Sequence, residues 1–147
     1  MEPRVSRGLA VGDLFNDGNL DLVVEDLQGS PMLLRNPRLP GRHWVSFELA
    51  GTKSNRLAIG ARLKIVAGGM TQTEEIHSGG SYLSQNDLRV HFGLGTAAKI
   101  ESVEIRWPSG AVETLNNLEA EKFYSVLEGQ GIVPAEKIRP TMPPKQP

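Results

Sequence analysis

Apolar and polar residues alternate along much of the chain, in short runs separated by turn residues. The clearest runs are Val45–Leu49, Ala61–Ile65, Leu88–Phe92, Val103–Trp107 and Phe123–Leu127. A period of two places the apolar side chains on one face of an extended segment, so each run predicts a half-buried β-strand. The polar segment Thr71–His77 follows Gly68-Gly69, which predicts a hairpin with the strand before it. Val112–Leu115 follows a Pro-Ser-Gly turn and predicts one more strand.

About seven short strands between Trp44 and Glu128 predict an all-β fold, an antiparallel β-sandwich. The competing helical stretch, Asn117–Lys122, is too short to be stable by itself. We expect the sandwich to occupy residues 41–129. Half of the ten prolines lie in the last fourteen residues, so residues 130–147 are expected to form an extended, Pro-rich tail.

Residues 1–40 have a different pattern, with three short apolar pieces separated by Asp, Asn and Gly. These pieces are Leu9–Val11, Leu20–Glu25 and Met32–Arg35. Three strands with one apolar face are only marginally stable alone. This small N-terminal β-segment is therefore expected to dock on the sandwich, to pair with another chain or to belong to a larger protein.

The composition excludes several classes of function. The 147 residues carry 16 Lys and Arg against 17 Asp and Glu, so the basic excess expected of a nucleic-acid-binding protein is missing. No apolar run reaches the roughly 18–20 residues that span a bilayer, and the first twenty residues contain no signal-peptide hydrophobic region. Without cysteine there is no disulfide and no thiol catalysis.

An acidic loop in the N-terminal segment has the spacing of a calcium site. Carboxylates stand at its first, fifth and ninth positions and glycine at its sixth: Asp13, Asp17, Asp21 and Gly18. Ca²⁺ takes about 6–8 oxygen ligands, and a tight glycine turn lets alternate residues converge, with the backbone carbonyl of Asn19 as a further ligand. The alternative is a plain hairpin in which Asn16-Asp17-Gly18 supplies the turn.

The loop resembles the calcium loop of FG-GAP integrin-type propeller repeats, whose pattern is D-x-[DN]-x-D-G-x-x-D. Phe15 replaces the ligand at the third position, so we expect a weak calcium site. A propeller has four to eight blades, and residues 1–40 hold one repeat. The resemblance implies the last blade of a longer parent protein, with the missing blades or another chain as its partner.

Four ordered motifs follow, namely Gly51–Arg62, Gly79–Gln85, His91–Gly95 and Arg106–Gly110. Together they resemble the ASPIC/UnbV domain of the cartilage acidic protein-like family, over about residues 42–129. That family combines FG-GAP repeats with this domain, and its members are commonly exported. The resemblance implies an extracellular or periplasmic binding or scaffold module, with a protein or glycan as partner, more than it implies a reaction.

Two loops rich in polar residues, Ser54–Arg56 and Ser81–Asp87, form the candidate ligand-binding site. If they meet at one end of the sandwich, they form a hydrogen-bonding patch of five residues: Arg56, Asn55, Tyr82, Gln85 and Asp87. The alternative, which we favour, is structural: Arg56 pairs with Asp87 and the loop amides satisfy backbone groups. The same loops motivate a second function, a carbohydrate- or metabolite-processing enzyme or accessory domain that uses Arg56 and Gln85.

We assign no catalytic residue from the sequence. Ser81, His77 and Asp87 could only form a triad within one loop, and the three histidines lack metal-site spacing. His91 is expected on the exposed face of its strand. Trp44 either covers the junction with the N-terminal segment, which we favour, or offers a flat surface for a sugar.

Overall fold

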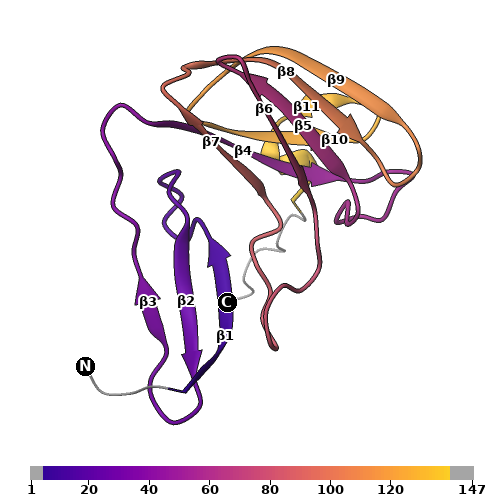
Figure 1. Cartoon of the computed structure of the whole chain (residues 1–147). Coiled ribbons are helices and arrows are strands. Elements are labelled where there is room, and N and C mark those ends of the chain that lie inside the picture. Colours follow the sequence, from indigo (N-terminus) through magenta and orange to yellow (C-terminus); the bar gives the residue numbers. More distant parts are fainter. Residues whose placement is uncertain (1–4, 140–147) are drawn as a thin grey trace, which may run out of the picture.

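The structure is a computed structural model, and it describes residues 5–139. Within these residues eleven strands form three sheets (Figure 1). In chain order the elements are β1 (Ser6–Gly12), β2 (Asp21–Asp26), β3 (Met32–Leu34), β4 (His43–Ala50), β5 (Arg62–Ala67), β6 (Met70–Glu75), β7 (Val90–Gly95), β8 (Lys99–Arg106), β9 (Val112–Glu119), β10 (Lys122–Leu127), β11 (Gly131–Val133) and the 3₁₀ helix η1 (Ala135–Lys137). No helix in this part of the chain is long and apolar enough to cross a membrane.

Two four-stranded sheets enclose the main core, and this confirms the all-β prediction with seven strands between His43 and Leu127. One sheet has the order β11-β10-β4-β7 and the other β6-β5-β8-β9. Their inward side chains are almost completely buried, among them Phe47, Phe92, Leu63, Ile65 and Ile105. The polar residues that alternate with them, such as Arg62 and Lys64, are exposed, as a half-buried strand requires.

One strand pair departs from the antiparallel prediction. β10 runs parallel to β4, with Phe123 opposite Ser46 and Leu127 opposite Ala50, whereas all other strand pairs of residues 5–139 are antiparallel. The cause is a crossing between sheets: β9 belongs to one sheet, and the chain passes through Glu121 into the other. There the backbone N–H of Glu121 donates to the Trp44 carbonyl at 2.7 Å, which starts the parallel ladder.

The C-terminal segment is docked up to residue 139, so the prediction of an extended tail from residue 130 is wrong for its first part. β11 pairs with β10, and Ile138 is buried against Ala50 and Leu127. The guanidinium of Arg56 donates to the Ile138 carbonyl at 2.6 Å. These contacts are long-range, and the proline content of the segment does not report them. The rest of the predicted tail, 140–147, lies outside the described residues.

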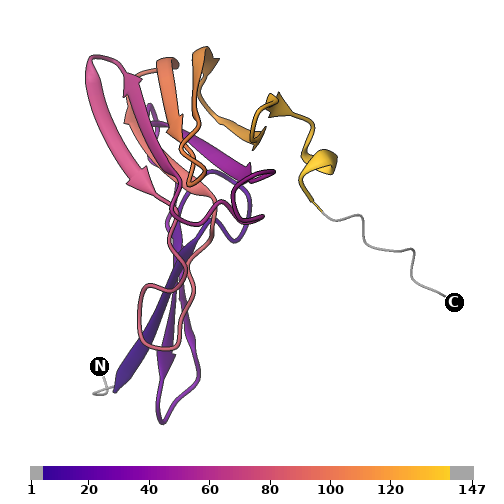
Figure 2. The ribbon, with the colours of Figure 1, turned by 90° about the vertical axis from the view of Figure 1, so that its right-hand side faces the viewer.

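The N-terminal strands form a separate antiparallel sheet of order β1-β2-β3 at one end of the sandwich (Figures 1 and 2). In both views the connection between β6 and β7 runs down beside β1. Three hydrogen bonds attach it there: the backbone N–H of Asp87 donates to the Val11 carbonyl at 2.9 Å, the N–H of Val11 donates to the Asn86 side chain at 3.0 Å, and the Ser81 hydroxyl donates to the Arg7 carbonyl at 3.4 Å. We call the contact region between this sheet and the sandwich the joint.

Candidate functional site at the joint

The acidic loop folds around its first carboxylate. The two oxygens of Asp13 accept backbone N–H groups from Asp17 and Gly18, at 3.0 and 2.8 Å. Asp17 accepts hydrogen bonds from the backbone and side chain of Asn19, and these bonds lower the pKa of Asp17, with a smaller contribution from Arg35. Backbone N–H groups, the Asn19 amide and Arg35 thus supply hydrogen bonds to the carboxylates of Asp13 and Asp17.

Arg35 supplies the positive charge beside this loop. Its guanidinium lies 3.2 Å from the Asp17 carboxylate and 4.4 Å from the centre of the Phe15 ring. Phe15 is the residue that departs from the FG-GAP pattern, so the aromatic ring and the guanidinium together occupy the surroundings of the missing ligand. Because the Arg35 side chain is 61% exposed, this cation–π contact is a weak one, of about 0.5–1 kcal/mol.

The carboxylates do not gather as a tight metal site would require. Among residues 5–139, no three acidic or histidine side chains come together at one point. Asp13 and Asp21 are buried, and one oxygen of Asp21 accepts from the backbone N–H of Asn36 while its other oxygen has no partner. Asp17 is turned toward Arg35 instead. The residues present therefore do not fit a tight calcium site.

Arg89 of the sandwich fastens the acidic loop in place. Its two terminal nitrogens donate to the Asn16 side chain at 2.6 Å and to the Asp13 carbonyl at 2.8 Å, and its Nε donates to Asp87 at 2.7 Å. The guanidinium also lies 5.2 Å from the centre of the Phe123 ring. A planar group with five donors can make these contacts at once, which a lysine cannot.

Trp44 and His91 complete the joint from the same sheet. A Cβ atom on Gly18 would lie 1.8 Å from the Trp44 indole, so the loop backbone packs directly on that ring. The His91 ring stacks on Trp44, and its Nε2 lies 2.9 Å from the Gly18 carbonyl oxygen. Because a carbonyl only accepts, this nitrogen carries the proton. Trp44 thus covers the junction, as favoured from the sequence, and His91 is not the free surface histidine we expected.

The loop Gly79–Asp87 follows the outer side of the joint, and we call it the recognition loop. The side chain of Gln85 holds the loop closed, since it accepts from the N–H of Gly79 at 2.6 Å and donates to the Asn86 carbonyl at 2.8 Å. At the tip, Tyr82 is 58% exposed and Leu83 is 90% exposed. Leu83 has a φ of +47°, a conformation that costs a residue with a Cβ atom about 1 kcal/mol or more.

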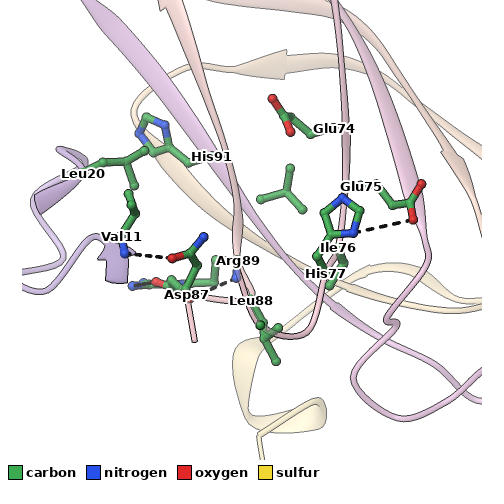
Figure 3. Close-up of a pocket in the computed structure, with 13 residues that line it drawn as sticks. Val11, Leu20, Glu74, Glu75, Ile76, His77, Asp87, Leu88, Arg89 and His91 are labelled. Atoms are coloured by element: carbon green, nitrogen blue, oxygen red, sulfur yellow. Dashed lines mark hydrogen bonds and ion pairs between the residues drawn. The ribbon is translucent and has the colours of Figure 1, made fainter. Parts of the chain in front are cut away.

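Two cavities lie on either side of the link between β1 and the recognition loop. They have volumes of about 260 and 410 Å³, and both are lined by Val11, Asn86, Asp87 and Arg89. Figure 3 shows the smaller cavity, into which Glu74, His77 and His91 also project. The larger one is lined by Asp13 and Gln85 as well. The joint therefore offers concave, mixed polar and apolar surface beside an exposed loop tip.

The predicted ligand patch is divided between two places. Gln85 and Asp87 lie at the joint, and the Tyr82 ring faces Arg7 of β1. Arg56 instead points to the C-terminal segment. The side chain of Asn55 closes its own turn through two hydrogen bonds with Ile59.

The expected ion pair between Arg56 and Asp87 is also absent from the described residues. Asp87 pairs with Arg89, and Arg56 bonds to a backbone carbonyl. Both loops lie at the same end of the antiparallel pair β4–β7, where Phe47 is opposite Val90, and Leu57 and Asp87 line one cavity there. Arg56 and Asp87 nevertheless bond to other partners, which short-range sequence patterns do not reveal.

Glu128 is a buried acidic residue that the sequence analysis did not single out. Its side chain is 4% exposed, and its carboxylate accepts five hydrogen bonds. The donors are the N–H groups of Thr52, Lys53 and Ser54 at 2.8 Å each, the Ser54 hydroxyl at 2.9 Å and the Ser109 hydroxyl at 2.5 Å. Two of the four motifs, Gly51–Arg62 and Arg106–Gly110, thus meet at one carboxylate, and their polar residues have a structural use.

Arg89 and His91 were also missed as joint residues. On the sequence they are the outward positions of a strand, which normally face solvent. Their role depends on the pairing of β7 with β4, which brings His91 near Trp44. The sequence pattern does not reveal which strands pair, so it gave no signal for these two residues.

The fold and the joint define an all-β module in which a sandwich carries a small sheet with an acidic loop. Residues 51–133 match the protein family described as ASPIC and UnbV, and the chain belongs to this family. It is 29% identical to "Cartilage acidic protein 1" of Mus musculus over 140 residues, which are 92% of this chain and 21% of that protein. It is 30% identical to the Xenopus tropicalis protein of the same name over 125 residues, 82% of this chain and 19% of that protein. The chain thus spans about a fifth of the length of these relatives.

Proposed function

We propose that this chain is a non-catalytic binding module that recognises a protein or glycan partner with the recognition loop and the joint cavities. The proposal rests on one observation: the base of this loop is hydrogen-bonded to β1, whereas its tip is exposed. Its base is fixed to β1 through Asn86 and Asp87, while Tyr82 and Leu83 project from the tip into solvent. Exposed aromatic and aliphatic side chains on a rigid support are typical binding anchors, because little entropy is lost when a partner covers them.

The proposal is tested by binding of the full chain to arrayed glycans and arrayed extracellular protein domains. The variant Tyr82→Ala/Leu83→Ser removes the anchors, and Val112→Ser is a matched control because Val112 is 53% exposed on β9. Binding lost in the first variant and kept in the control, with equal thermal stability, supports the proposal. Unchanged binding of the double variant would refute it.

We further propose that residues 1–40 are one FG-GAP-type repeat of a longer protein. The match to the mouse relative covers 92% of this chain and so extends beyond residues 51–133. The sheet also leaves large apolar side chains exposed, among them Leu9, Leu33 and Leu34, as a blade without its neighbours would. The test is the coding sequence upstream of residue 1, in which further D-x-[DN]-x-D-G-x-x-D repeats are expected.

An extracellular location and weak calcium binding complete this proposal. The name of both relatives refers to cartilage, which supports the location. Asp13, Asp17, Asp21 and the Asn19 carbonyl are the residues that would hold a calcium ion, which would supply positive charge to the acidic loop. Because Asp17 is engaged with Arg35, the affinity is expected to be low. Thermal unfolding with millimolar Ca²⁺ tests this, and an unchanged Tm would remove calcium from the proposal.

A further inference from the structure

A second concave surface lies across the joint from the recognition loop, along the linker between β3 and β4. It consists of two adjoining cavities of about 220 and 480 Å³ that share Asn19, Asn36, Pro37 and Arg38. Arg35 lines one of them and Arg42 the other. We call this surface the basic groove. Its three arginines concentrate positive charge in a chain whose net charge is only -1.

The arginines of the groove differ in how far their charge is neutralised. Arg35 pairs with Asp17, and Arg38 pairs with Glu121, which His43 also contacts. The guanidinium of Arg42 has no hydrogen-bond or ion-pair partner among residues 5–139. Two of the three cations are therefore held in position by carboxylates, and the third is available to an anion.

The groove is already formed without a ligand. The linker is fixed at one end by the N–H of Asn36, which donates to the buried carboxylate of Asp21 at 3.0 Å. At the other end the N–H of Arg42 donates to the Leu39 carbonyl at 3.3 Å. Pro37 restricts the backbone between them. A preformed site avoids the entropy cost of ordering a loop on binding.

We infer that the basic groove binds an acidic saccharide, with a carboxylate or sulfate group on Arg42. A guanidinium matches the planar, bidentate geometry of such groups. The amide side chains of Asn19 and Asn36 would bond to sugar hydroxyls, and Pro37 and Leu39 would contact the apolar face of a ring. The small volumes of the two cavities, about 220 and 480 Å³, favour one or two sugar units over an extended peptide. This inference does not depend on the recognition loop.

The test is calorimetric titration of the full chain with three probes: a heparin tetrasaccharide, a hyaluronan tetrasaccharide and a tetraglutamate peptide. We expect both saccharides to bind if a carboxylate suffices, and only heparin if sulfate is needed. Arg42→Gln should weaken saccharide binding about tenfold. Arg42→Lys should weaken it less, because lysine keeps the positive charge but cannot make the bidentate hydrogen bonds of a guanidinium.

Arg106→Gln is the control, since Arg106 is also an exposed arginine, pairs with Glu104 and lies on β8 away from the groove. It should leave binding unchanged, as should Tyr82→Ala/Leu83→Ser, which separates this site from the recognition loop. Three results would overturn the inference: no saccharide binding at millimolar concentration, binding that Arg42→Gln does not weaken, or tetraglutamate binding as tightly as the saccharides. The last would assign the groove to an acidic protein.

Discussion

Ser54 donates twice to Glu128, once from its backbone N–H at 2.8 Å and once from its hydroxyl at 2.9 Å, although the two residues are 74 positions apart. Three successive N–H groups of one loop point at a single carboxylate here, an arrangement suited to bind an anion. The anion is part of the chain, so the loop is fastened to the end of β10. This contact engages the backbone N–H groups of Thr52, Lys53 and Ser54 and the Ser54 hydroxyl, so these groups are not free for a ligand.

The stability of the protein should therefore depend on the ionisation of Glu128. Burial by itself raises the pKa of Glu128, but hydrogen bonds from the Ser109 hydroxyl and from three backbone N–H groups outweigh it and lower the pKa from 4.5 to about 2. A lowered pKa means that the stabilisation is complete above pH 4.5 and is lost as the pH falls toward 2.

We expect Glu128→Gln to lower the free energy of unfolding at pH 7 by about 2 kcal/mol. The amide oxygen is a weaker acceptor than a carboxylate oxygen, and the amide NH₂ group would face N–H and O–H groups that are themselves donors. The variant should also lose most of the wild-type decline in stability between pH 4.5 and 2. Urea denaturation of both proteins at pH 7 and pH 3 measures this. An equal decline in wild type and variant would show that other carboxylates dominate.

Gly18→Ala should damage the joint far more than an equivalent change elsewhere. Gly18 has a φ of +85°, and an added Cβ would lie 1.8 Å from the Trp44 ring. Gly69, in the β5–β6 turn, has a φ of +75° and open space at its Cβ position. Gly69→Ala therefore carries only the backbone cost of about 1 kcal/mol.

The expected loss for Gly18→Ala is larger, about 2–3 kcal/mol, and includes displacement of the acidic loop from Trp44. Thermal unfolding and the fluorescence of Trp44, recorded in a Trp107→Phe background, measure both effects. If the two glycine variants were equally stable and had the same Trp44 emission, the packing of Gly18 on Trp44 would be refuted.

Sequence periodicity predicted the strands because alternation is a local property. The runs around Val45, Leu63 and Phe92 each form a strand whose apolar face is buried. The parallel pairing of β10 with β4 and the docking of Ile138 are long-range, so no local pattern reveals them.

The site was predictable only in part for the same reason. The carboxylates of the acidic loop were visible as a motif, but the partner of Asp17 is Arg35, 18 positions away. Arg89, which holds the loop, is 76 positions from Asp13. Their roles follow from the docking of one sheet on another, which the sequence pattern left as one of three alternatives.

Deletion of residues 1–40 should leave a folded sandwich, because the main core consists of residues from Val45 onward. Removal of the acidic loop would uncover Trp44 and the Phe123 ring packed against it. We expect a soluble all-β protein with a Tm lower by roughly 5–10 °C. Circular dichroism and thermal unfolding measure it. An unfolded or aggregated product would mean that the N-terminal sheet belongs to the same folding unit.

Arg35 should weaken calcium binding in the acidic loop, because its guanidinium engages Asp17 at 3.2 Å. Arg35→Gln frees that carboxylate, so millimolar Ca²⁺ should raise the Tm of the variant more than that of wild type. Arg62→Gln, which breaks an exposed pair with Glu75 on the sandwich, is the control. An equal Ca²⁺ response of wild type and Arg35→Gln would contradict competition between the arginine and the metal.

The central claim is that sandwich side chains, rather than a metal ion, hold the acidic loop in place. Amide hydrogen exchange of residues 13–21 in the full chain, with excess EDTA, tests it most directly. We predict that the N–H groups of Asp17 and Gly18, which bond to Asp13, exchange slowly in wild type and at least tenfold faster in Arg89→Ala. Exchange at the rate of an unstructured peptide in metal-free wild type would contradict the account.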